Sequence, residues 1–216
     1  MDTFEESAAA KVVRARRFEV VDEAGETRAA LRVLPDGSPG LDLYDAAGEV
    51  RAGLVVLPDG SPGLYLSDAE GKVRAGLAVC SDGTPALGLH DAAGEVRAGL
   101  AVGSDGSPAL GLYDAAGEKR GVLGALPEGA WGLTLKDVGG KTQAGLTVHP
   151  DLGAHLVLLD ARGQLRAVLD APRDGRTFLS LYDAAGEVRA GLEVNRDGSP
   201  ALRLADAAGN IIWQAP

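Results

Sequence analysis

A 23-residue stretch recurs throughout the chain, and this repetition limits what the chain can fold into. It reads GLDLYDAAGEVRAGLVVLPDGSP from Gly40 to Pro62, and within it apolar residues alternate with polar ones, as at Leu41 and Leu43. After a first copy near Arg17, further copies begin at about Gly40, Gly63, Ala86, Ala109, Gly132, His155, Phe178 and Ala201. Alternation with a period of two is typical of strands with one buried face. The sequence therefore predicts an all-β fold of nine hairpins, with about 18 strands.

Two kinds of turn separate the strands. In Asp45–Gly48 the aspartate can accept a hydrogen bond from the backbone two residues on, and the glycine can adopt a positive φ. Pro58–Gly60 has the composition of a three-residue hairpin loop. Counting outward from the first turn, as a four-residue loop, places Leu43 opposite Val50 and Leu41 opposite Ala52. Counting from the second places Leu54 opposite Leu64. Apolar residues meet in both cases, which favours an antiparallel up-and-down meander.

A one-sided sheet of this size must hide its apolar face. We expect the last strand to close onto the first, which removes the unpaired edges and turns the leucines inward. A regular barrel of so many strands would leave a channel, so the barrel should be shallow or flattened, with small residues such as Ala52 and Gly53 letting its walls approach. The alternative is a β-solenoid with one 23-residue repeat per coil and stacked leucine ladders. We expect a single repeat domain over residues 12–216, after a short polar segment over residues 1–11.

Composition and charge narrow the class of partner. The chain has 216 residues, of which 45% are hydrophobic but only 4% aromatic, so a core must consist of Leu, Val and Ala. Its net charge of −10 argues against nucleic acid and against anionic membrane surfaces. The single cysteine, Cys80, excludes an internal disulfide. The chain as written has neither an apolar run of about 18 residues nor a signal peptide. We therefore expect a cytoplasmic protein, with membrane attachment only through an anchor outside this chain.

The repeat also resembles a known family. The columns LxLxDxxGxxRAxLxVxxDGSP, the opening VVRARRFEVVDEAGE and the closing GNIIWQAP are similar to the bacterial β-flower family of hairpin-repeat proteins. The resemblance implies a shallow symmetric β-barrel that carries hairpin petals and has a tubby-like outline. It implies no particular activity, and the tubby-like outline points toward lipid or membrane association.

The residues give little support for catalysis or metal binding. His90 occupies a solvent-face column, whereas His149 and His155 flank an irregular loop that contains Asp151, in which the turn glycine is displaced to Gly153. Two histidines and one carboxylate without a shaped cavity rarely make a zinc site. The serines lie mostly in turns, without a plausible base, and the turn aspartates have structural roles. The sequence thus predicts no enzyme, no metal and no cofactor.

One column could contact a ligand. Arginine recurs at Arg28, Arg51, Arg74, Arg97, Arg120, Arg166 and Arg189. A row of guanidinium groups could hold a phosphate-bearing ligand or an acidic partner, but we favour ion pairs with neighbours of the Asp42 or Glu49 type. The candidate contact residues are Arg51, Arg74, Arg97, Arg120, Trp131 and Trp213.

Three functions remain for comparison. We favour a non-enzymatic structural or interaction module, because no group of reactive residues stands out from the repeat. The alternative is a lipid-like or other apolar ligand in the barrel mouth, near Trp131, Trp213 and Phe178. The third, an enzyme, would need reactive side chains that converge in one pocket. The partner is thus a protein or an apolar ligand, and the oligomeric state is left open.

Overall fold

A computed structural model describes residue 12 and residues 14–215 of the chain. The described residues divide into two compact units, a first that ends at Ser81 and a second that begins at Asp82. The predicted polar segment over residues 1–11 lies outside the described residues. The prediction of one domain over residues 12–216 stays a prediction.

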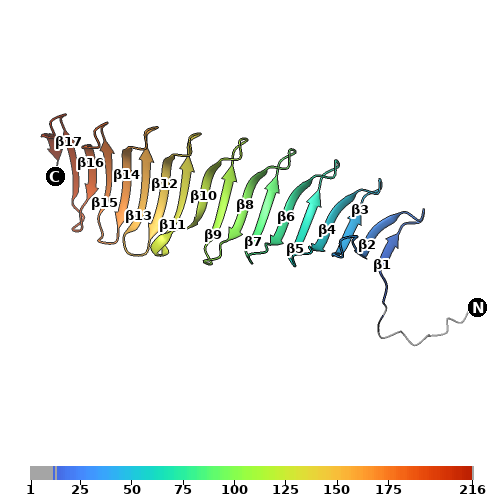
Figure 1. The fold of residues 1–216 in the computed structure, drawn as a ribbon. Coiled ribbons are helices and arrows are strands. Elements are labelled where there is room, and N and C mark those ends of the chain that lie inside the picture. Colours follow the sequence, from blue (N-terminus) through green and yellow to red (C-terminus); the bar gives the residue numbers. More distant parts are fainter. Residues whose placement is uncertain (1–11, 13, 216) are drawn as a thin grey trace, which may run out of the picture. The chain divides into compact units, whose positions relative to one another are not determined.

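The first unit contains six strands that follow one another in chain order (Figure 1). They are β1 (Arg17–Val21), β2 (Thr27–Val33), β3 (Pro39–Tyr44), β4 (Val50–Val56), β5 (Pro62–Ser67) and β6 (Val73–Val79). Each pairs antiparallel with the next strand of the unit. The unit is therefore a meander of hairpins, as the alternating pattern predicts.

The second unit contains twelve strands with the same connectivity. They are β7 (Pro85–His90), β8 (Val96–Val102), β9 (Pro108–Tyr113), β10 (Lys119–Ala125), β11 (Trp131–Lys136), β12 (Thr142–His149), β13 (Gly153–Leu159), β14 (Leu165–Pro172), β15 (Thr177–Tyr182), β16 (Val188–Val194), β17 (Pro200–Ala205) and β18 (Ile211–Ala215). A short 3-10 helix, η1 (Pro127–Gly129), replaces one turn. All pairings within this unit are antiparallel and join consecutive strands. The all-β meander is confirmed here too.

The two turns set different registers. Across the Pro58–Gly60 turn Leu54 lies opposite Leu64, which confirms the prediction. Across the Asp45 turn Leu43 lies opposite Ala52 and Leu41 opposite Leu54, so the predicted pairs there are wrong by two residues. The carboxylate of Asp45 accepts the backbone N–H groups of Ala47 and Glu49, both at 2.9 Å, which keeps Glu49 inside the loop. Arg51 then forms a β-bulge, and because the total shift is even, apolar residues still meet.

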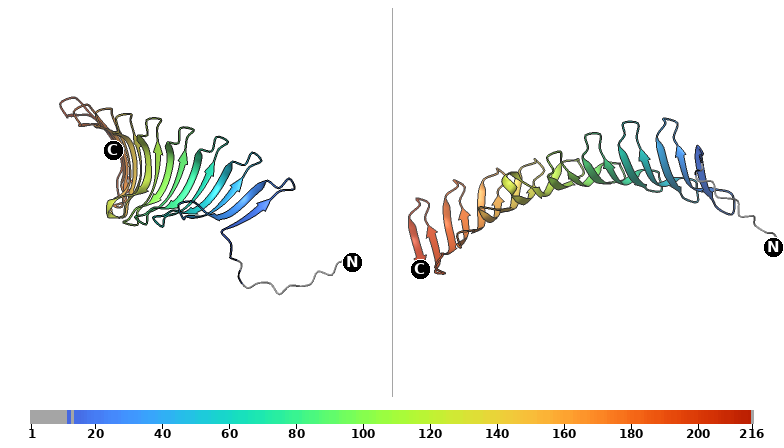
Figure 2. Two further views of the ribbon diagram at one scale, coloured as in Figure 1. Left: turned by 45° about the vertical axis from the view of Figure 1, so that its right-hand side comes forward. Right: turned by 90° about the horizontal axis from the view of Figure 1, so that it is seen from below.

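Each unit is one layer of strands with two different sides (Figure 2). We call the side that carries the leucines of each LxL pair and their cross-strand partners the leucine face. The opposite side, which carries Gly53 and its counterparts, we call the glycine face. In neither unit does the last strand pair with the first, and the described pairings of β1 and β18 are only with β2 and β17. The predicted closure into a barrel is therefore wrong, although the aligned leucines expected of the solenoid alternative are present.

The core is correspondingly small. Among the described residues the buried hydrophobic side chains are Ala30, Ala130, Val168 and Ala201, and no large side chain is fully buried. The leucines that we expected to face inward are exposed, for example Leu54 at 50%. With no second layer of strands or helices to cover them in the described part of each unit, they remain in contact with water. Hairpin ladders and turn hydrogen bonds, rather than a packed interior, hold the strands together.

Candidate functional site

An unbroken row of leucines crosses the leucine face at right angles to the strands. In the second unit each of its leucines lies directly opposite the next one across a strand pair. This central row consists of Leu87, Leu100, Leu110, Leu123, Leu133, Leu146, Leu156, Leu169, Leu179, Leu192 and Leu202. The first unit has a similar row, Phe18, Leu31, Leu41, Leu54, Leu64 and Leu77. The even register shift at each bulge keeps these rows straight.

Beside the central row of the second unit runs a second row, in which large and small residues alternate. We call it the alternating row. Its members from β7 to β17 are Leu89, Ala98, Leu112, Gly121, Leu135, Ala144, Leu158, Ala167, Leu181, Ala190 and Leu204. The leucines of this row are well exposed, for example Leu112 at 48% and Leu135 at 47%. The surface therefore has regularly spaced projections with gaps between them.

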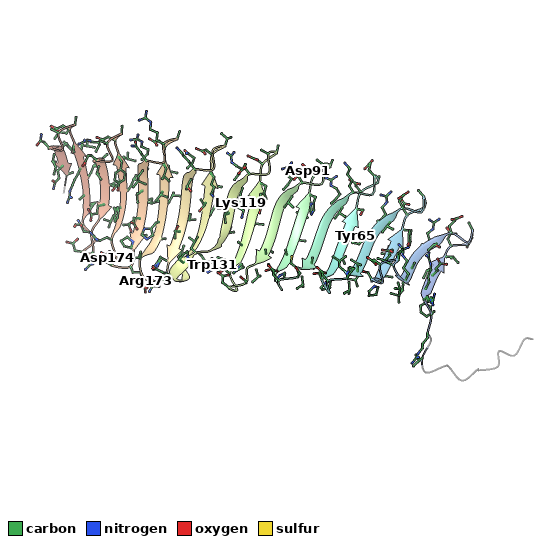
Figure 3. The ribbon with its side chains drawn as sticks, in the orientation of Figure 1. Tyr65, Asp91, Lys119, Trp131, Arg173 and Asp174 are labelled. Atoms are coloured by element: carbon green, nitrogen blue, oxygen red, sulfur yellow. The ribbon has the colours of Figure 1, made fainter. Side chains whose placement is uncertain are left out.

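The leucine face carries no charge at its paired positions. In the strand registers of both units these positions hold Leu, Val, Ala, Gly, Pro, Phe and Trp, with Thr177 as the polar exception. Both candidate tryptophans belong to this face, because Trp131 lies opposite Ala125 and Trp213 opposite Leu204. Figure 3 labels Trp131 at the beginning of β11, and its side chain is 51% exposed. Phe178, by contrast, lies opposite Asp170 and Glu193 on the glycine face.

The glycine face carries both polar and apolar side chains, and some of them cover part of it. In the first unit Tyr65 (labelled in Figure 3) lies over Gly53 and donates a hydrogen bond to the carboxylate of Asp42 at 3.1 Å. Asp42 is buried and also pairs with Arg32 at 2.8 Å. Burial makes the largest contribution to raising the pKa of Tyr65, and the hydrogen bond to the Asp42 carboxylate raises it further. The Asp42 carboxylate is thus held by both Tyr65 and Arg32.

The arginine column ties neighbouring hairpins together. Arg97 donates through Nε to the carboxylate of Asp91 at 2.8 Å and also to the backbone carbonyl of Asp114, in the next turn of the same kind. Arg189 bonds Asp183 and the carbonyl of Asp206 in the same way. The acidic partners are thus the turn aspartates six residues earlier, and the predicted partners of the Asp42 and Glu49 type are wrong. In five further copies the arginine likewise pairs with the aspartate six residues earlier, at Arg28, Arg51, Arg74, Arg120 and Arg166.

Gln143 shows what this contact requires. It stands in the arginine column, and its side-chain amide donates to Asp137 at 3.0 Å and to the carbonyl of Asp160 at 3.1 Å.

We therefore expect Arg97→Ala to lower the melting temperature by about 2–4 °C, since it removes both links. Arg97→Gln should recover most of that loss. Thermal unfolding followed by circular dichroism measures both variants, and equal melting temperatures for Arg97→Ala and Arg97→Gln would contradict a linking role.

The histidines do not share a site in the described part of the chain. The ring Nδ1 of His149 accepts the backbone N–H groups of Asp151 and Leu152 at 3.0 and 3.2 Å. His155 instead pairs with Asp170 at 2.9 Å. No group of three or more His, Cys, Asp or Glu side chains arranged to hold a metal ion occurs among the described residues. His90 contacts the carbonyl of Gly94 at 3.1 Å, near its own turn.

Comparison with known proteins gives little further information. No protein-family model and no curated protein matches the chain, so the resemblance to the β-flower family stays a prediction. Similar solved structures include a mutant of the TCP10 domain of Danio rerio CPAP, with 17% identity, coverage of 86% of this chain and 98% of that chain, and a TM-score of 0.32. The SAS-4 (dCPAP) TCP domain of Drosophila melanogaster, in complex with a proline-rich motif of Ana2, has 13% identity, coverage of 88% and 96%, and a TM-score of 0.38. Structural similarity at these identities and TM-scores supports no functional argument.

Within the described residues, no helix has the length and apolar character needed to cross a bilayer.

Proposed function

We propose that the protein is a non-enzymatic interaction module that binds a protein partner through the leucine face of its second unit. The observation that carries this proposal is the uncharged leucine face itself, whose large side chains stand about half exposed in water. Monomeric proteins rarely expose contiguous apolar patches beyond about 300–600 Å² unless the patch is a site of interaction. A row of eleven leucines with a second apolar row beside it exceeds that range.

The polar residues support the same conclusion. The turn aspartates accept backbone N–H groups, and most of the column arginines hold both an aspartate and the next turn. These groups are therefore engaged in holding the hairpins in register. The alternative, a lipid-like ligand in a barrel mouth, requires a closed barrel, and neither unit closes into one.

Site-specific photo-crosslinking tests the proposal. Leu135 lies on the leucine face and Thr134 on the glycine face of the same strand, β11. A benzophenone amino acid at position 135 should give crosslinked protein products in the producing cell, and the same group at position 134 should give far fewer. Equal crosslinking from both positions, or none from position 135, would contradict the proposal. The mass of the product separates a second copy of the chain from a different protein.

A further inference from the structure

We infer that the partner of the leucine face is a second copy of this chain, in a two-fold symmetric dimer in which the leucine faces of the two second units pack together. The inference rests on the proposed function and names its partner. Two properties of the face favour a second copy over other partners, its lack of charge and its alternating shape, and its area is large enough for a dimer.

Lack of charge makes the face compatible with itself. The chain has a net charge of −10, so most pairs of surfaces from two copies would bring like charges together. The leucine face is an exception, because its paired positions hold no charged residue in any strand of the second unit. Two such faces can meet without burying an unpaired charge, which would be strongly unfavourable.

The alternating row gives the face a self-complementary shape. Neighbouring strands lie about 4.8 Å apart, so Leu112 and Leu135 project about 9.6 Å from each other, with the small Gly121 between them. A facing copy offset by one strand would place its leucines over these gaps and receive the leucines of the first copy in its own. Stacked sheets pack about 10 Å apart with interdigitating side chains. A two-fold axis makes both halves of such a contact identical.

The area suffices for a stable interface. A large aliphatic side chain that is half exposed leaves on the order of 50 Å² of apolar surface in water. Some 20 side chains on the leucine face of the second unit are exposed to this degree, including Val148 and Leu192. Together they offer on the order of 1,000 Å², compared with about 800 Å² per partner in a standard protein interface. This face alone therefore offers enough apolar area for a dimer interface.

Sedimentation velocity of the full chain over a concentration series tests the inference. We expect the unmodified protein to sediment with about twice the 22.0 kDa mass of one chain. Leu135→Lys should raise the dimer dissociation constant by about 100-fold or more, because it places a charge in the interface. Thr134→Lys adds the same charge to the glycine face of the same strand and should leave the dimer intact.

A gap-filling variant separates a fitted interface from general stickiness. Ala144 is one of the small residues between the leucines of the alternating row. Ala144→Leu adds apolar surface, yet it should weaken the dimer by about tenfold because it overpacks the gap. Tighter association of this variant would overturn the fitted dimer. Circular dichroism establishes whether each variant is folded. If Leu135→Lys does not fold, Ala144→Leu still tests the inference.

The outcomes also separate the two proposals. A protein that is monomeric at every concentration, together with crosslinks from position 135 to a different protein, would overturn the dimer and leave the interaction module in place. A monomer without crosslinks from position 135 would overturn both. A dimer that Leu135→Lys leaves unchanged would exclude the leucine face as its interface.

Discussion

Acidification from about pH 5 to pH 2 is expected to lower the melting temperature of both units, with most of the loss below about pH 4. The turn carboxylates are responsible, because hydrogen bonds in the folded protein stabilise their charged form. For Asp45 the backbone N–H of Glu49 has the largest effect, and Arg51 adds to it, so that the pKa of Asp45 lies below 3.8. For Asp174 the Arg196 side chain contributes most and the pKa falls to about 2. Lowered pKa values are found for Asp22, Asp45, Asp59, Asp68, Asp82, Asp91, Asp105, Asp114, Asp137, Asp160, Asp174, Asp183, Asp197 and Asp206.

The direction of this effect follows from linkage. A carboxylate whose pKa is lower in the folded state stabilises the fold above its unfolded pKa, and that stability is lost as the pH falls through the folded value. The window therefore extends from the ordinary aspartate value of 3.8 downward to about 2, the pKa of Asp174. Melting temperatures measured by circular dichroism between about pH 7 and pH 2 give the profile.

Asparagine provides the matched control for acid unfolding. Replacement of Asp91, Asp114 and Asp160 by Asn keeps an oxygen that can accept the turn N–H groups but removes the charge that pairs with arginine. This variant should melt at a lower temperature near neutral pH and lose less on acidification. A melting temperature of the unmodified protein that stays constant between about pH 5 and pH 2 would show that the turn carboxylates do not control stability.

Replacing Gly153 by valine is expected to destabilise the second unit by about 3 kcal/mol or more. Gly153 begins β13 with a φ of 101°, a conformation that β-branched residues very rarely adopt. A Cβ at this position would also press on the carbonyl oxygen of Ala171 and lie 2.9 Å from the Cα of Pro172. Both neighbours are backbone atoms of the paired strand β14, so they cannot move away without breaking the ladder.

Gly163→Ala is the control for Gly153→Val. Gly163 has a φ of 81°, but a Cβ there would meet nothing within 4 Å. This substitution adds backbone strain without a clash and should cost about 1 kcal/mol. Urea unfolding gives the free energy of unfolding of both variants. If the two losses were equal, the contact with β14 would have no energetic role.

Much of the fold follows from the repeat. Alternation predicts the strands, and Asp with Gly three residues later predicts the turns. The irregular loop before Gly153 is also predicted, and its distinct form is confirmed by the bonds from Asp151 and Leu152 to His149. The bulge at Arg51 is missed because a four-residue count ignores Glu49, whose N–H also bonds Asp45. Arginine recurs six residues after the turn aspartate in seven copies. This constant spacing could have predicted that each arginine pairs with the turn aspartate of its own copy.

The state of the apolar face could not be predicted in the same way. Alternation shows that the two sides of a strand differ, but not whether the apolar side is covered by the same chain or by another molecule. Leu54 would have the same neighbours in sequence in either case. Counting by twos from Leu133 does place Trp131 on the leucine side, so this candidate residue could have been assigned to a face from the sequence.

Because each leucine of the central row lies opposite the next, the exposed apolar surface within a unit can change in length by fixed increments. Each 23-residue copy contributes two further leucines to the same line, without altering those already present. Duplication or deletion of an internal copy would lengthen or shorten the footprint by two strand widths, about 10 Å, and leave the pattern of contacts unchanged. Copy number can therefore set the extent of the leucine face, with no change in its pattern of side chains.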